Sequence, residues 1–202
     1  MQIIELVLDE DNLEENNGIT AISIVHSGAI ESDFIALKNQ EFKFAEQDKE
    51  KRILMGAALI PNKPIYRKSG EEEYYIFFSK DTVRKASELF FIKGNQSEST
   101  LEHESALKGL TVVESWIVEG EQDKSRHYGL NAPIGTWMVS MKVNNDDVWN
   151  NYVSTGKVKG FSIEAYFSSK LEQRPKDKTL KEEAAAQEFI NTISKILKES
   201  NE

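Results

Sequence analysis

The 202-residue chain contains no cysteine at all. Disulfide frameworks, thiolate metal sites and cysteine nucleophiles are therefore excluded. Histidine is scarce as well, because His26, His103 and His127 are the only three imidazoles in the sequence. Any acid–base chemistry that depends on histidine must therefore use one of these three side chains.

Basic charge is also in short supply. The 25 lysines and arginines face 34 aspartates and glutamates, which gives a formal net charge of −9. A protein that binds nucleic acid without regard to sequence needs a basic face, so the balance favours a protein partner. The start of the chain lacks a basic segment and a long apolar run, and nowhere do about 18 apolar residues follow one another. We expect no membrane segment and a cytosolic protein.

Alternation of apolar and polar residues predicts a mostly β core with 39% hydrophobic residues in the chain. Segments 110–118 and 135–143 alternate most strongly and should pair as antiparallel neighbours. Helical spacing after Ser79 predicts one helix, and "NNDDVWNNYVSTG" predicts a second, short one. The other predicted strands are 3–8, 19–25, 52–60, 72–79 and 158–167.

The composition changes after Pro175, where charged residues predominate. Thr179 and Glu182 form a capping box, and an apolar stripe from Phe189 to Leu197 follows. We therefore predict two domains: a β domain over residues 1–172 and a charged, helical C-terminal appendage over residues 173–202.

Ser162 lies in the predicted strand "GKVKGFSIEAYF", on the same face as Glu164. Gly160, two positions earlier, allows another backbone or a substrate to approach closely. A strand serine on the solvent face is the plain alternative. Ser162 is a candidate nucleophile only if a histidine lies within reach, and His103, in the loop "STLEHESAL", can be placed against a neighbouring strand.

Glu114 is the third candidate, because it shares a predicted strand face with Val112, Trp116 and Val118. An acid on an apolar face must be paired, placed at an edge or functional, since burying a bare charge costs several kcal/mol. Two interpretations stay open: an ion pair with a lysine or arginine across the sheet, or a carboxylate that orients the histidine. Glu164 is the reserve for the second role.

Several segments in order resemble the prohead proteases of phages and prophages of Gram-positive bacteria. They are "ILMGAALIPNKPIYR", "EEYYIFFSKDTV", "LEHE", "VVESWIVEGEQDKS", "GTWMVSMKV" and "GKVKGFSIEAYF", and the earlier "VHSGAIESDFIAL" resembles the group as well. The resemblance covers roughly residues 15 to 168. The sequence departs from the family at Ala165, where relatives commonly have glycine.

The resemblance implies a fold similar to the herpesvirus assembly proteases, an α+β fold with a mostly antiparallel β-barrel of about six to eight strands, ringed by a few helices and followed here by the C-terminal amphipathic helix. It maps the nucleophile onto Ser162 and the base onto His103. We expect these two to lie within hydrogen-bond reach, or a modest rotamer change of it, and to open to solvent or a shallow groove. Segments 110–118, 135–143 and 158–167 should share one sheet system.

The implied function is a serine protease that needs neither metal nor organic cofactor. Its implied partners are the scaffold and major capsid proteins of the same phage, which it digests in the host cytoplasm within the assembling procapsid, with self-association as a further expectation. Two other classes remain open: a non-catalytic head or tail component on a related β-barrel, and a protein-interaction module. The second predicts that His103 and Ser162 lie far apart.

Overall fold

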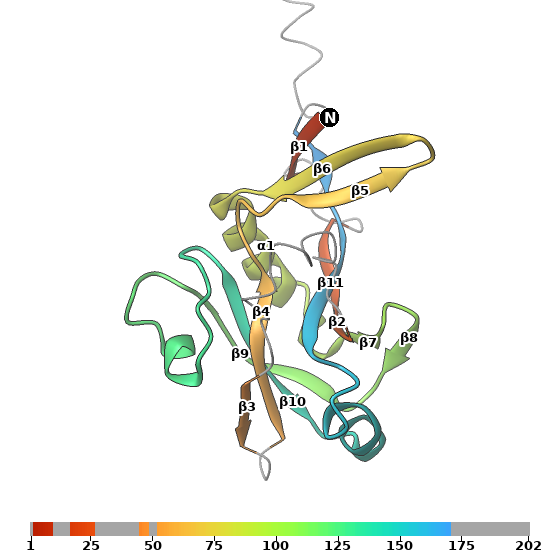
Figure 1. The fold of residues 1–202 in the computed structure, drawn as a ribbon, viewed down its shortest axis with the longest axis vertical. Coiled ribbons are helices and arrows are strands. Elements are labelled where there is room, and N and C mark those ends of the chain that lie inside the picture. Colours follow the sequence, from red (N-terminus) through yellow and green to blue (C-terminus); the bar gives the residue numbers. More distant parts are fainter. Residues whose placement is uncertain (1, 10–16, 27–44, 49–51, 171–202) are drawn as a thin grey trace, which may run out of the picture. The chain divides into compact units, whose positions relative to one another are not determined.

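The computed structural model describes residues 2–9, 17–26, 45–48 and 52–170 (Figure 1). The described strands form three four-stranded sheets, and the helices among them are short. Contacts group the residues from Met1 to Ser169 into one unit. The predicted appendage, residues 173–202, lies outside the described residues, so it and the domain boundary remain predictions.

The sheet that matters for the candidate site has the strand order β11-β2-β7-β8. Its strands are β2 (Gly18–Val25), β7 (Ser99–Leu101), β8 (Ser105–Leu107) and β11 (Gly160–Tyr166). β2 pairs antiparallel with β11 on one side and parallel with β7 on the other. The sheet therefore places segments from three distant parts of the sequence side by side.

The second sheet has the order β3-β4-β10-β9 and is antiparallel throughout. Its strands are β3 (Ala45–Asp48), β4 (Ile53–Leu59), β9 (Leu110–Ile117) and β10 (Trp137–Val143). The predicted pairing of 110–118 with 135–143 is confirmed, with Ser115 opposite Val139. β10 is central and almost entirely buried, which explains why apolar residues occupy both of its faces.

The third sheet has the order β12-β1-β6-β5. Its strands are β1 (Gln2–Val7), β5 (Ile65–Ser69), β6 (Glu72–Phe78) and β12 (Ser168–Ser169). β5 and β6 form an antiparallel hairpin, and β1 runs parallel to β6. The sequence patterns predicted β1 and β6 but missed β5, whose alternation is weak and whose last residues are exposed.

Helix α1 (Lys80–Ile92) begins where Ser79 caps it, as predicted. The Ser79 hydroxyl accepts a hydrogen bond from the backbone N–H of Thr82, one of the donors that a helix start leaves unpaired. Val83, Ala86 and Phe90 are buried and form the apolar face. The ring of Phe90 meets the fully buried Trp137 edge to face at 5.4 Å, so α1 anchors β10 in the core.

The second predicted helix is present as α2 (Asp146–Val148) followed by one wider turn, η5 (Trp149–Val153). Asn145 caps it through its side-chain oxygen, which accepts from Val148 N–H at 3.0 Å. Two single-turn 3₁₀ helices, η3 (Asn95–Ser97) and η4 (Lys124–Tyr128), lie in connections. The α+β class with a mostly β core is confirmed.

The predicted barrel is not confirmed, because none of the three described sheets closes on itself. β11 contacts β4, but the two strands share no hydrogen-bonded ladder. The expectation that 110–118, 135–143 and 158–167 belong to one sheet system is therefore wrong: β9 and β10 lie in one sheet and β11 in another. Packing between sheets, rather than continuous pairing, joins these strands.

Replacing Ser79 with alanine tests the start of α1. We expect Ser79→Ala to lower the free energy of unfolding by about 1 kcal/mol, because the Thr82 N–H loses its acceptor. Ser79→Asp keeps an acceptor at the cap and should retain most of the stability. Urea denaturation followed by circular dichroism measures both, and equal losses in the two variants would show that the cap contributes nothing.

Candidate active site

Ser162 lies on β11, directly opposite Ser23 of β2. Only 4% of the residue is exposed, and its Oγ is buried without a hydrogen-bond partner. The serine is therefore not open to solvent, but it is among the residues that line a pocket of about 280 Å³, so the expectation of a groove stays a prediction. Most buried hydroxyls are paired, so an unpaired one calls for an explanation in terms of function or an unseen partner.

His103 lies at the tip of the hairpin that joins β7 to β8. Glu102 and His103 have φ angles of 52° and 61°, and the N–H of Glu104 donates to the carbonyl of Leu101 at 3.0 Å. Two successive residues with positive φ are the mark of a type I′ turn, which normally favours asparagine and glycine. Non-glycine residues pay about 1–2 kcal/mol each for this conformation.

Strand β2 holds this turn in place. The N–H of Glu102 donates to the carbonyl of Ile24 at 3.1 Å, and the N–H of His103 donates to Ser23 Oγ at 3.0 Å. The carboxylate of Glu102 in turn accepts from the N–H of His26 at 2.6 Å. These hydrogen bonds offset the backbone strain and give His103 a defined place beside the sheet.

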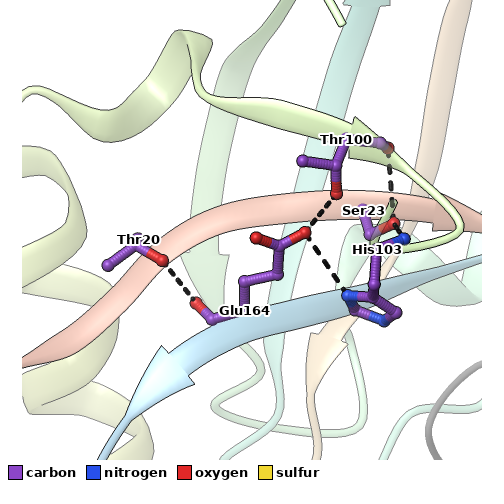
Figure 2. Close-up of polar contacts among 5 residues, drawn as sticks. All are labelled: Thr20, Ser23, Thr100, His103 and Glu164. Carbon is purple, nitrogen blue, oxygen red and sulfur yellow. Dashed lines mark hydrogen bonds and ion pairs between the residues drawn. The ribbon is translucent and has the colours of Figure 1, made fainter. Parts of the chain in front are cut away.

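Glu164 is the carboxylate that reaches His103 (Figure 2). Its Oε1 lies 3.4 Å from Nδ1 of His103, and the hydroxyl of Thr100 donates to the same oxygen. Glu164 lies on β11 and Thr100 on β7, so the side chain passes over β2, where its opposite residue is the small Ala21. Figure 2 shows the imidazole turned toward this carboxylate from the hairpin side.

This contact decides which imidazole nitrogen is left for chemistry. A carboxylate at Nδ1 favours a proton on that nitrogen and leaves Nε2 as the acceptor. Among the described residues, Nε2 of His103 has no hydrogen-bond partner. The same division of roles, with an acid at Nδ1 and a nucleophile at Nε2, is what a serine–histidine–acid site needs.

His103 and Ser162 are brought to the same face of one sheet, with Ser23 between them. Residues two apart on a strand share a face, so Ser162 projects to the side on which Glu164 meets His103. The described residues show no hydrogen bond between Ser162 and His103. The predicted direct reach between the two side chains therefore stays a prediction, one that requires a change of rotamer.

Glu114 is placed elsewhere, on β9 in the β3-β4-β10-β9 sheet. It accepts a hydrogen bond from its cross-strand partner Ser140 at 2.5 Å and forms an ion pair with Lys124, whose Nζ lies 3.0 Å away. The hydrogen bonds from Ser140 and Lys124 hold the pKa of Glu114 below its usual value. The structure thus favours the ion-pair interpretation, with a lysine supplied by η4 rather than by a neighbouring strand.

The other two histidines have different surroundings. Nδ1 of His26 lies 2.8 Å from the carbonyl of Lys157, which can only accept, so that nitrogen carries a proton. His127 lies in η4. Among the described residues, only the imidazole of His103 contacts a carboxylate.

A pocket of about 280 Å³ borders β11, and Ser162 is one of its lining residues. Phe78, Phe161 and Ile163 contribute to its walls, and Arg67 and Lys63 are also among its lining residues. The strand that carries Ser162 and Glu164 therefore borders a mostly apolar pocket.

Neither a metal centre nor a membrane span is evident in the part of the chain that the structure describes. No group of three or more histidine, aspartate or glutamate side chains is arranged there to hold a metal ion. No described helix has both the length and the apolar character that crossing a bilayer requires.

A family model described as "Putative phage serine protease XkdF" matches residues 41–171, and this span includes His103, Glu114, Ser162 and Glu164. The chain belongs to this phage serine protease family. Its membership makes it a hydrolase of the serine protease class. No curated protein and no solved structure matches the chain. The expected likeness to herpesvirus assembly proteases stays a prediction.

The sequence patterns did not single out two residues of the site, Ser23 and Thr100. Both are ordinary strand residues in "ITAISIV" and "ESTLE", and nothing in their local pattern separates them from structural hydroxyls. Ala165, the departure from the family pattern, follows a shift of register between β11 and β2. Its φ is not positive, so alanine fits where glycine is common in relatives.

The lowered pKa of Glu114 predicts a pH-dependent stability. A carboxyl group whose folded-state pKa is depressed stabilises the protein above its unfolded-state pKa, and this contribution is lost as pH falls through the folded value. Because 45% of the side chain is exposed, we expect Glu114→Gln to lower the free energy of unfolding by only about 0.5–1 kcal/mol at pH 7.

The difference between Glu114→Gln and the unchanged protein should shrink toward zero in acid, as measured by urea denaturation over a pH series. Glu119→Gln removes a more exposed carboxylate that lies 3.7 Å from Arg84, and it controls for the loss of one negative charge together with one exposed ion pair. A difference that stays constant down to acid pH would contradict the predicted role of the Ser140 and Lys124 contacts.

Proposed function

We propose that the chain is a serine endopeptidase that cleaves the scaffold and major capsid proteins of its phage during procapsid maturation. The observation that carries the proposal is the contact between Glu164 and Nδ1 of His103, which lies on the same sheet face as Ser162. Membership of the phage serine protease family supports the reaction class. The identity of the substrates rests on the prohead-protease resemblance of the sequence.

In the proposed reaction, Nε2 of His103 takes the proton of Ser162 Oγ as that oxygen attacks a peptide carbonyl carbon. The imidazolium then gives the proton to the leaving amine, and the peptide C–N bond breaks. Water, activated by the same imidazole, hydrolyses the acyl-enzyme and restores Ser162. Acylation and deacylation each begin with an unprotonated Nε2, and the carboxylate at Nδ1 favours the tautomer that leaves Nε2 free.

We assign the acid of the site to Glu164 rather than to Glu114. Glu164 lies 3.4 Å from Nδ1 of His103, where a negative charge stabilises the imidazolium that forms after proton transfer. Glu114 is occupied by Ser140 and Lys124 in a different sheet. Glu164, the second choice from the sequence, therefore takes the catalytic role that was expected of Glu114.

The proposed setting is the assembling procapsid in the host cytoplasm. There the enzyme digests the scaffold protein, which leaves room for DNA. The segment 173–202 mediates its assembly into the procapsid or its self-association. A polypeptide substrate must displace whatever covers Ser162, since this hydroxyl is buried. The pocket that Ser162 lines together with Phe78 and Phe161 is available for a substrate side chain next to the scissile bond.

The burial of Ser162 also favours a second candidate, a non-catalytic head or tail component. A structural protein keeps such a hydroxyl inside, whereas an enzyme must expose it at some stage. The interaction-module hypothesis fits less well, because it predicts His103 and Ser162 far apart. Ser23 instead hydrogen-bonds to the N–H of His103 and pairs with Ser162.

Incubation of the full-length protein with the scaffold and major capsid proteins of the same phage tests the proposed function. We expect discrete cleavage products by gel electrophoresis and mass spectrometry, and a loss of at least about a thousand-fold in rate for Ser162→Ala. Ser162→Ala should fold normally, since its hydroxyl has no partner to lose. No cleavage by the unchanged protein favours the non-catalytic candidate, and equal cleavage by both proteins contradicts Ser162 as the nucleophile.

The choice between the two acids has its own test. We expect Glu164→Gln to lower kcat about a hundred-fold, because the amide neither fixes the imidazole tautomer nor stabilises its cation. Glu114→Gln is the matched control in the other sheet and should keep kcat within about two-fold. Loss of activity in Glu114→Gln with activity retained in Glu164→Gln would reverse the assignment.

A further inference from the structure

Ser23 occupies the middle of the sheet that carries the candidate site. Its partner across β11 is Ser162, and its partner across β7 is Thr100. The residue has no solvent-exposed surface. A small polar residue at this buried position therefore lies between the strand of the proposed nucleophile and the hairpin of the proposed base.

Both hydrogen bonds of the Ser23 hydroxyl are made to the β7–β8 hairpin. It donates to the carbonyl of Thr100 at 3.3 Å and accepts from the N–H of His103 at 3.0 Å. A hydroxyl has a single proton to donate, so Ser23 has none left for Ser162. Ser162 Oγ has no hydrogen-bond partner of its own.

The acceptor role of Ser23 meets a specific need of the turn. His103 is the second of two left-handed residues, a conformation that the surrounding contacts must hold. Without the Ser23 oxygen, the N–H of His103 loses its hydrogen bond, and the turn loses one of its ties to β2. The imidazole would then be free to leave the carboxylate of Glu164, which is a 3.4 Å contact at a partly exposed site.

We propose that Ser23 is a positioning residue: its buried hydroxyl fixes the His103 turn so that Nδ1 stays against Glu164 and Nε2 remains available to Ser162. Its catalytic consequence rests on the proposed protease function. The coupling that it maintains between His103 and Glu164 exists whether or not the protein cleaves a substrate. Ser23 acts through His103 and touches no substrate atom in this role.

The coupling is measured by NMR of the Cε1–H ring signal of His103, identified by its loss in His103→Gln. We expect Glu164→Gln to shift this signal in the otherwise unchanged protein and to shift it by less than half as much when Ser23 is alanine. An equal shift in both backgrounds overturns the proposal. This outcome does not depend on activity, so it separates failure of the proposal from failure of the proposed function.

Two further variants guard against a merely structural explanation. Ser99→Ala is the matched control, because Ser99 is a buried serine on β7 whose hydroxyl has no hydrogen-bond partner. The effect of Glu164→Gln on the His103 signal should persist undiminished in that background. Ser23→Cys keeps a side chain of similar shape, but its sulfur is a weak hydrogen-bond acceptor. It should therefore reduce the shift as Ser23→Ala does, and it provides the test if the alanine variant folds poorly.

Steady-state kinetics with the scaffold protein as the substrate give the second readout. We expect Ser23→Ala to lower kcat about ten-fold with little change in KM, since the base is misplaced but the substrate site is not. Ser23→Thr, which restores a hydroxyl, should recover more activity than Ser23→Cys. A rise in KM with unchanged kcat, or recovery by cysteine as complete as by threonine, overturns the positioning role.

Discussion

The candidate site depends on the register of three strands. β11, β2 and β7 align Ser162, Ser23 and Thr100 in one row, and this alignment places Glu164 where it can reach across Ala21 to the hairpin that carries His103. Side chains alternate along a strand, so a slip of β11 by one residue against β2 would turn Ser162 and Glu164 to the apolar side. The buried Phe161 on the opposite face of β11 makes such a slip costly, because it would leave the core.

Two local features of the site are unfavourable in free energy, and the strand register holds both in place. The left-handed Glu102 and His103 pay about 1–2 kcal/mol each in backbone strain. The unpaired hydroxyl of Ser162 costs roughly 1–3 kcal/mol more if no water or substrate reaches it. The described residues show such features elsewhere too, since Arg52 and Asn62 are left-handed and the buried hydroxyls of Ser99 and Thr136 have no partner. In the candidate site they occur together, at the turn that carries His103 and on the strand that carries Glu164.

The two candidate acids show how tertiary contacts divide similar residues between different roles. Glu114 and Glu164 both lie on strands beside apolar neighbours, and each is bonded to a hydroxyl, Ser140 or Thr100. The cation beside Glu114 is a permanent lysine charge, which makes the pair a stabilising contact. The partner of Glu164 is an imidazole, whose charge appears only on protonation. A carboxylate that faces a titrating group is suited to catalysis, and one that faces a fixed charge is suited to structure.

By itself the sequence determined the β-rich class, the cap of α1 and the pairing of β9 with β10, which follow from local information: side-chain period and capping residues. Ser162 and His103 were chosen as the candidate pair through the resemblance to prohead proteases and the presence of only three histidines. The tertiary structure alone decided which acid faces His103, that Ser23 bonds to its turn, and that Ser162 is buried. Those contacts join residues some 60 to 80 positions apart along the chain. Their formation depends on which strands become neighbours, and no local pattern encodes that choice.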